Sequence, residues 1–345
     1  MSERTYQDYT HPLWRRLLVN RESAIIALLA IVLLIASLVV PRFATPATLT
    51  YLLLDVATIL IIALAMTPIM ITGDIDLSVG SMVGLSSVVF GVTFQAGWSV
   101  PMAMVVALIV GGVGGALNGL LVTRIGLPAL AVTIGTMALY RGIAVGLLGT
   151  TAVTSFPKEW TSLAKAKLPG TPIPVVMLLF LVLLVAFALM LHFSRFGRGI
   201  YAIGLSKDAA TFYGVDVART RLILFILSGL VAALGGIYYT LRYGSARGDN
   251  ATGLELQVIA AVVLGGVSVF GGRGALHGVI AGVLLIGSLS SALRLANVTA
   301  DVINIITGVL LVVSVVASSV IDWVQRRRVK LSNRKSPTAQ PATVG

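Results

Sequence analysis

Polar residues that interrupt the apolar stretches of this sequence are the candidates for its chemistry. Asp74, Asp76 and Ser78 lie in the segment 71–81, between two apolar runs. Carboxylates and hydroxyls in such a position are costly unless they face water or protein. Two interpretations are open: a polar hinge beside a translocation path, or a cytoplasmic turn in which Asp76 caps the next helix. The span count given below favours the turn.

A second group of polar residues lies inside apolar runs. Arg141 must reach an interface or find a partner, so snorkelling to the outer face, a salt bridge and contact with a solute all remain open. Threonines in such helices more often bond carbonyls of their own helix than bind a ligand. Gln257 is a candidate donor to a polyol, or a residue that bonds a neighbouring helix. The translocation-path candidates are Asp76, Ser78, Thr133, Thr136, Arg141 and Gln257.

Several kinds of chemistry are excluded by what the sequence lacks. It has no Gly-x-x-x-x-Gly-Lys-Ser/Thr loop, so it cannot hydrolyse ATP by that route. His11, His192 and His277 are scattered and there is no cysteine, so no metal site and no thiolate nucleophile is suggested. We therefore predict no catalytic residue, no metal and no cofactor, and a protein that is not itself an enzyme.

The composition is that of a membrane protein. The chain is 57% hydrophobic and 11% charged, with a mean hydropathy of +0.99, whereas soluble domains carry about 25% charged residues. Its net charge is +12, but the basic residues lie at the ends of apolar runs and interleave poorly with aromatics. This pattern indicates membrane topology and contact with lipid, and excludes a nucleic-acid partner.

The apolar runs predict an all-α membrane protein of about ten transmembrane helices, some short or broken. With the N-terminus placed inside, most lysines and arginines fall on the cytoplasmic side, which predicts two cytoplasmic termini. The run 50–72 contains Thr67-Pro68, and the glycine-rich run 254–271 either spans or is re-entrant. The predicted parts are a cytoplasmic segment 1–23, a membrane domain 24–323 and a basic, disordered cytoplasmic tail 324–345. The runs are 24–40, 50–72, 79–96, 100–123, 128–149, 174–193, 221–241, 254–271, 275–293 and 301–323.

The polar loop 195–221 contains the signal of a short helix. Ser206 is a plausible N-cap and Gly214 a stop after about two turns. Phe212 and Tyr213 give this helix an apolar side, so it either docks on another protein or rests on lipid headgroups. The residues of this candidate docking helix are Ser206, Lys207, Asp208, Ala209, Ala210, Phe212, Tyr213 and Gly214.

Four stretches in family order resemble the membrane-spanning permease subunit of bacterial ABC importers for monosaccharides, the ribose, xylose, arabinose, rhamnose and autoinducer-2 group. They cover nearly the whole chain. Asp74 departs from the glycine usual in this family, and Ser206 and Thr211 from its usual asparagine and arginine. The segments 243–247 and 292–298 are most similar to rhamnose-type and autoinducer-2-type permeases. The four stretches are 71–81; Asn118-Gly119 with Pro128, 133–137 and Arg141-Gly142; Gly197-Arg198 with 201–204, Ala209-Ala210 and Gly214-Val215; and 259–266 with 271–274.

This resemblance implies an assembly in the bacterial inner membrane. Two permease subunits, identical or paralogous, would form the pathway, with two cytoplasmic ATPase subunits and an extracytoplasmic sugar-binding protein as partners. The loop 195–221 would then couple the permease to the ATPases. The alternative is a secondary transporter of a small polar solute driven by an ion gradient, which would need acidic residues within the membrane. The acidic residues of this chain lie near the ends of the apolar runs, which counts against that alternative.

Overall fold

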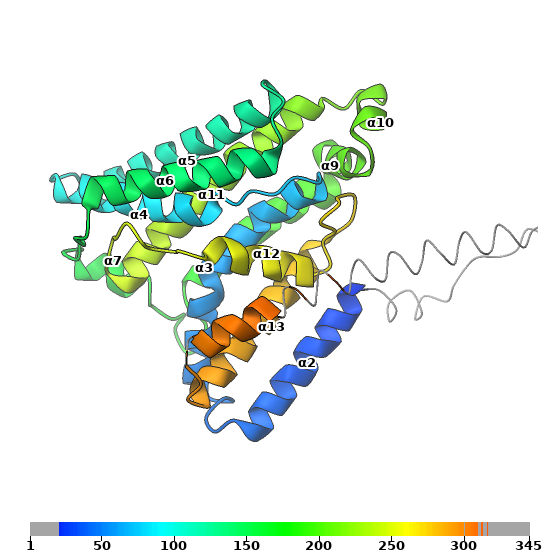
Figure 1. Ribbon diagram of the computed structural model, residues 1–345. Coiled ribbons are helices and arrows are strands. Elements are labelled where there is room, and N and C mark those ends of the chain that lie inside the picture. Colours follow the sequence, from blue (N-terminus) through cyan, green and yellow to red (C-terminus); the bar gives the residue numbers. More distant parts are fainter. Residues whose placement is uncertain (1–20, 300, 310–311, 313–315, 317–345) are drawn as a thin grey trace, which may run out of the picture.

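The computed structural model describes residues 21–299, 301–309, 312 and 316, and its regular elements within them are all helices (Figure 1). The prediction of an all-α protein is confirmed, because the described residues form no β-strand, only two isolated bridges. The helices are α2 (Arg21–Val39), α3 (Pro46–Ile71), α4 (Val79–Gln95), α5 (Val100–Thr123), α6 (Ala129–Leu148), α7 (Lys158–Leu163), α8 (Val176–Ala188), a π-helical turn η1 (Leu189–Phe193), α9 (Arg195–Leu205), α10 (Lys207–Phe212), α11 (Val217–Tyr243), α12 (Leu254–Leu264) and α13 (Leu276–Leu295). Residues 301–309 are also helical.

Six helices of the described chain are long and apolar enough to cross a membrane: α3, α5, α6, α8 with η1, α11 and α13. The apolar parts of α2, α4 and α12 are shorter. The structure therefore supports a multi-pass all-α membrane protein but not the count of ten transmembrane helices. The predicted cytoplasmic segment 1–23 and tail 324–345 lie almost wholly outside the described residues, as does most of the run 301–323.

Helix α3 is the most buried of the six. Its sequence is apolar on every side, as expected of a helix surrounded by protein. Thr45 caps its start and Pro46 occupies the first turn, where a missing N–H costs nothing. The helix continues through Pro68 to Ile71, so the break suggested by Thr67-Pro68 does not occur there.

Helix α11 packs against α5, α4 and α3. Its contact with α5 needs glycine, because a Cβ added to Gly229 would lie 2.1 Å from the carbonyl oxygen of Gly111. Small residues at such crossings let helix backbones touch in lipid, where packing rather than the hydrophobic effect holds helices together. The glycine richness of the sequence thus serves close packing around α11.

Helices α4 and α12 begin inside the bundle rather than at its surface. A Cβ added to Gly80, in the first turn of α4, would lie 3.1 Å from the backbone nitrogen of Glu255, in the first turn of α12. Each helix follows a non-helical connection, 72–78 before α4 and 244–253 before α12. The first turns of these two short helices therefore meet in the interior.

Candidate functional site

The predicted docking helix is present as α10, which projects from the bundle beside α9 (Figure 1). Ser206 caps it by accepting a hydrogen bond from the Ala209 nitrogen at 3.2 Å, and Gly214 ends it with φ +80°. Phe212 and Tyr213 are 92% and 88% exposed. Ala210, in contrast, is buried and fixes the opposite side of the helix. Two aromatic side chains are thus presented outward by a short, well-capped helix.

Backbone contacts fix the base of this helix to the bundle. A Cβ added to Gly204, near the end of α9, would lie 1.9 Å from the carbonyl oxygen of Ile71, the last residue of α3. The nitrogen of Gly272 donates to the same oxygen at 2.8 Å. The Tyr201 hydroxyl donates to the Gly274 carbonyl at 2.8 Å. The ends of α3 and α9 and the connection 265–275 therefore meet at one point.

An ion pair links the same region to α11. Asp74 is buried and accepts from the Arg221 guanidinium through both oxygens, Nε to Oδ2 at 2.5 Å and Nη2 to Oδ1 at 2.7 Å. Lys207, the first residue of α10, lies 3.7 Å from Oδ1. Asp74 was expected as a polar residue of the segment 71–81 that departs from the family's usual glycine, and the sequence carries no local signal that would pair it with a residue 147 positions away.

Asp76 and Ser78 lie together in a buried hydrogen-bond network. Asp76 Oδ1 accepts from the Ser78 nitrogen at 3.0 Å and from its hydroxyl at 2.6 Å. The Ser228 hydroxyl of α11 donates to Oδ2 at 2.8 Å, and the Asn118 amide of α5 donates to the Ser78 hydroxyl at 2.8 Å. Every oxygen of the carboxylate therefore has a partner, and the network fixes the start of α4 against α11 and α5. Sequence reasoning missed Ser228, and used Asn118 only for the resemblance.

The two threonines of α6 differ in their bonding. The Thr133 hydroxyl donates to the Ile75 carbonyl at 3.1 Å and so ties α6 to the connection 72–78. The Thr136 hydroxyl donates to the Val132 carbonyl of its own helix at 3.1 Å. Both are buried, so neither side chain presents a free hydroxyl to a pathway in this conformation.

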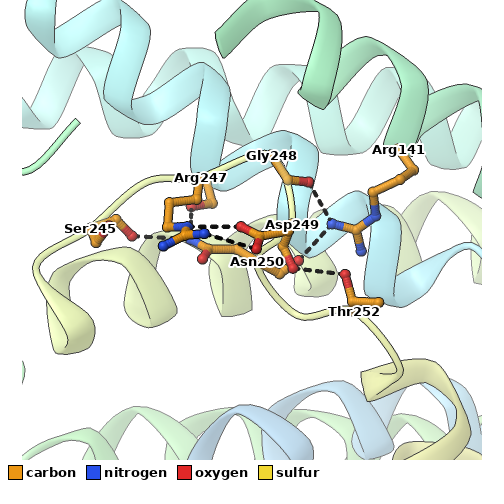
Figure 2. A network of polar contacts seen from close by, with 8 residues as sticks. Arg141, Ser245, Arg247, Gly248, Asp249, Asn250 and Thr252 are labelled. Carbon is orange, nitrogen blue, oxygen red and sulfur yellow. Dashed lines mark hydrogen bonds and ion pairs between the residues drawn. The ribbon is translucent and has the colours of Figure 1, made fainter. Parts of the chain in front are cut away.

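Arg141 finds its partners in backbone carbonyls (Figure 2). Nη1 donates to Gly248 O at 2.8 Å and to Asn250 O at 2.7 Å, and Nη2 donates to Gly80 O at 3.3 Å. The guanidinium thus holds the connection 244–253 against α4 and does not snorkel. Among the described residues it forms no salt bridge, although Glu255 lies close to the same junction with a buried Oε2 that has no hydrogen-bond partner there.

Gln257 lies in a different place from the other path candidates. Its side chain lines a pocket of about 270 Å³ between α3, α11, α12, α13 and residues 301–309. No described residue hydrogen-bonds its amide group. The predicted path residues therefore separate into two groups. The buried Asp76, Ser78, Thr133 and Thr136 and the half-buried Arg141 make structural contacts, whereas Gln257 lines open space.

No group of three or more metal-ligating side chains gathers anywhere in the described part of the chain. The arrangement can hold helices together and present surfaces, and the described residues offer no metal site for chemistry.

Comparison with known proteins places these features in a context. Residues 48–315 match the protein family described as the permease component of the branched-chain amino acid transport system. The autoinducer 2 import system permease protein LsrD of Salmonella paratyphi B is 33% identical over 328 residues, 91% of this chain and 98% of that protein. The LsrD proteins of Escherichia coli O157:H7 and Yersinia enterocolitica are 34% and 35% identical, over 89% and 78% of this chain and 96% and 84% of their own length. No solved structure matches the chain.

Proposed function

The chain belongs to the permease component family of the branched-chain amino acid transport systems, and from this premise we propose that it is the permease subunit of a sugar importer driven by separate ATPases. It is a multi-pass inner-membrane protein, and separate ATPase subunits would hydrolyse the ATP. Its partners would be two cytoplasmic ATPase subunits, a second permease subunit and an extracytoplasmic sugar-binding protein. The observation that carries the proposal is the exposed aromatic pair of α10 on a helix whose base is fixed to the bundle.

The contacts at the base of α10 would carry a movement of the ATPases into the bundle. A push on α10 reaches the end of α3 through the Gly204–Ile71 contact, and α11 through Asp74 and Arg221. Because close-packed elements move as rigid units, the two helices would shift together. Nucleotide and the loaded binding protein would each favour one arrangement of the helices by binding it more tightly.

The contacts also support a topology of about ten crossings with both termini in the cytoplasm. The connection 244–253 and the short α12 together run from the far end of α11 to the Gly272–Ile71 contact near α10. The connection 72–78 and α4 run the other way, from that region to Gln95. Each short helix, together with the connection before it, would then cross the membrane once. The short run 254–271 would therefore be part of a full crossing and not a re-entrant segment.

The relatives and the pocket at Gln257 support a small sugar as the substrate class. The LsrD proteins are named for import of autoinducer 2, and a small sugar-like solute of that kind fits this chain better than an amino acid. An amino acid would require free charges for its ammonium and carboxylate groups. The two charged residues among those lining the pocket, Asp55 and Arg294, bind each other at 3.0 Å instead. A neutral sugar needs only neutral donors and acceptors.

One observation favours the alternative of an ion-driven transporter. The Glu255 carboxylate has a buried oxygen without a hydrogen-bond partner among the described residues. An acid in such a position could carry a proton. Uptake into vesicles decides between the two: the ATP-driven importer requires ATP and its ATPase, whereas a proton-driven transporter works without ATP and stops on addition of an uncoupler.

The docking proposal is tested by the double substitution Phe212→Ser and Tyr213→Ser. We expect the ATPase to stop co-purifying with the permease, because two exposed aromatic anchors are lost from the interface. The permease itself should remain folded, since neither side chain is packed. Tyr51→Ser is the matched control, an exposed aromatic on α3 near the opposite end of the molecule, and should leave binding unchanged. Retention of the ATPase by the double variant would contradict the docking role.

A further inference from the structure

The pocket that contains Gln257 lies far from α10. Tyr243, the last residue of α11, lines it, whereas the first turns of α11 lie beside α10. A helix of 27 residues is about 40 Å long at 1.5 Å per residue, which exceeds the hydrocarbon thickness of a bilayer. The pocket therefore lies near the membrane face opposite the docking helix, the side from which an imported solute would arrive.

The walls of this pocket carry polar side chains for which the described residues offer no hydrogen-bond partner. The side chains of Thr58, Gln257, Ser290 and Ser291 form no hydrogen bond with any described residue. Thr58, although only 3% exposed as a residue, lines the pocket together with the other three. Four such groups around one space can hydrogen-bond water or a polar ligand that enters it.

The chemistry of the lining describes the ligand. Asp55 binds Arg294 and also Arg242, so both charged residues of the lining are engaged in ion pairs, and the remaining groups offer neutral hydroxyls and amides. Tyr239 and Tyr243 contact each other with ring centroids 4.5 Å apart and add an aromatic surface to the wall. Neutral hydrogen-bonding groups beside aromatic rings suit a ring with many hydroxyls and one apolar face.

The size of the pocket limits the ligand further. Pockets for drug-sized ligands occupy about 300–1,000 Å³, and this one measures about 270 Å³. A single sugar ring or a five-carbon polyol with a few waters fits that volume.

The wall of the pocket is also held in a costly backbone conformation. Ala251, which lines the pocket, is buried with φ +59°. The left-handed region is unfavourable for a residue with a Cβ, because the Cβ then lies too close to a backbone carbonyl oxygen. Such a conformation persists only where the surroundings fix it, which is a common property of ligand-binding loops.

We propose that this pocket binds one neutral monosaccharide-sized molecule on its way into the permease, with Gln257 and Ser290 among the residues that hydrogen-bond it. The proposal rests on the proposed function and deepens it, since it places a sugar site within a single subunit. The pocket and the docking helix lie at opposite ends of α11, so the two can fail separately.

The first test is the transport kinetics of the complete importer with Gln257→Leu. Loss of one hydrogen bond to the sugar should raise the concentration for half-maximal uptake about tenfold. ATPase co-purification should be unchanged. Gln95→Leu, the same substitution at an exposed position at the end of α4, is the control and should transport like the wild type.

The second test uses the absence of cysteine from the chain. Ser290→Cys, purified with its ATPase, would be labelled with a small thiol reagent in the presence of autoinducer 2, D-ribose or L-rhamnose. At least one of the three should slow labelling severalfold at residue 290 and leave Thr151→Cys, exposed outside the pocket, unaffected. An unchanged half-maximal concentration in Gln257→Leu, or labelling at residue 290 that none of the three slows, would overturn the pocket. A wild-type complex that binds no ATPase, or takes up none of the three, would instead overturn the proposed function.

Discussion

The two ends of the α3–α11 pair are held by similar ion pairs that have different surroundings. At one end Asp74 binds Arg221 of α11, with Lys207 of α10 nearby. At the other end Asp55 of α3 binds Arg242 of α11 and Arg294 of α13. In each case an aspartate in or just after α3 joins α11 to a third element. The third element differs: it is α10 in the first case, and in the second it is α13, which borders the pocket at Gln257.

This difference shows how one type of contact can serve two roles. Asp74 and Arg221 are both largely shielded from solvent, at 6% and 12% exposed, so their ion pair is suited to transmit a movement without breaking. Asp55 is 33% exposed and Arg294 66% exposed, so that contact can open at lower cost. An importer that receives its movement at α10 would require a shielded ion pair there, at Asp74, and could use a more exposed one beside the pocket, at Asp55.

The largest expected effect comes from breaking the shielded pair with Asp74→Ala. It would leave Arg221, 12% exposed, without its carboxylate. Removing one partner of a buried pair costs about 3–5 kcal/mol, and we expect about 3 kcal/mol here because some water reaches the site. The measurement is the free energy of unfolding of the purified permease by detergent titration. Asp208→Ala, an exposed aspartate on α10, is the control and should change stability by less than about 0.5 kcal/mol.

The opposite end should be more tolerant. Asp55→Ala leaves Arg242 with the Leu54 carbonyl as an acceptor, and Arg294 is free to turn to water. We expect a loss of about 1–2 kcal/mol in the same titration, between the values for exposed and buried pairs. A loss equal to that of Asp74→Ala would show that the two ends are held alike, and would remove the contrast drawn above.

Some features of the fold were predictable from local pattern. Apolar runs of sufficient length predict helices because a backbone in lipid must satisfy its own hydrogen bonds. The Ser206 cap and Gly214 stop of α10 are local signals, and the structure confirms both. The number of full-length spans was not predictable in this way, since hydropathy cannot distinguish a long helix from a short one with an extended connection.

The roles of the polar residues were not predictable, because their partners are distant in sequence. In the sequence, Asp76 and Gln257 have similar surroundings, since both are polar residues near glycines in an apolar chain. In the structure the Asp76 carboxylate bonds Ser78 and Ser228, whereas Gln257 faces a pocket. The partners of Arg141 were not predictable either. It donates to the backbone carbonyls of Gly248 and Asn250, and any residue type supplies a backbone carbonyl.

The smallest changes in the free energy of unfolding should come from replacing the exposed basic partners, Lys207 and Arg294. Which of the two changes is larger is the finest test of the contrast between the Asp74 and Asp55 ion pairs. Lys207 is 49% exposed and 3.7 Å from Asp74, while Arg294 contacts Asp55 at 3.0 Å. Exposed pairs contribute about 0–1 kcal/mol, so Lys207→Met should lie near zero and Arg294→Met slightly above it. Raising the salt to about 1 M should reduce the difference, because the Debye length falls from about 10 Å at 0.1 M to about 3 Å at 1 M. A Lys207→Met variant as unstable as Asp74→Ala would mean that α10, rather than Arg221, holds the carboxylate, and the driven end would then loosen whenever the docking helix moves.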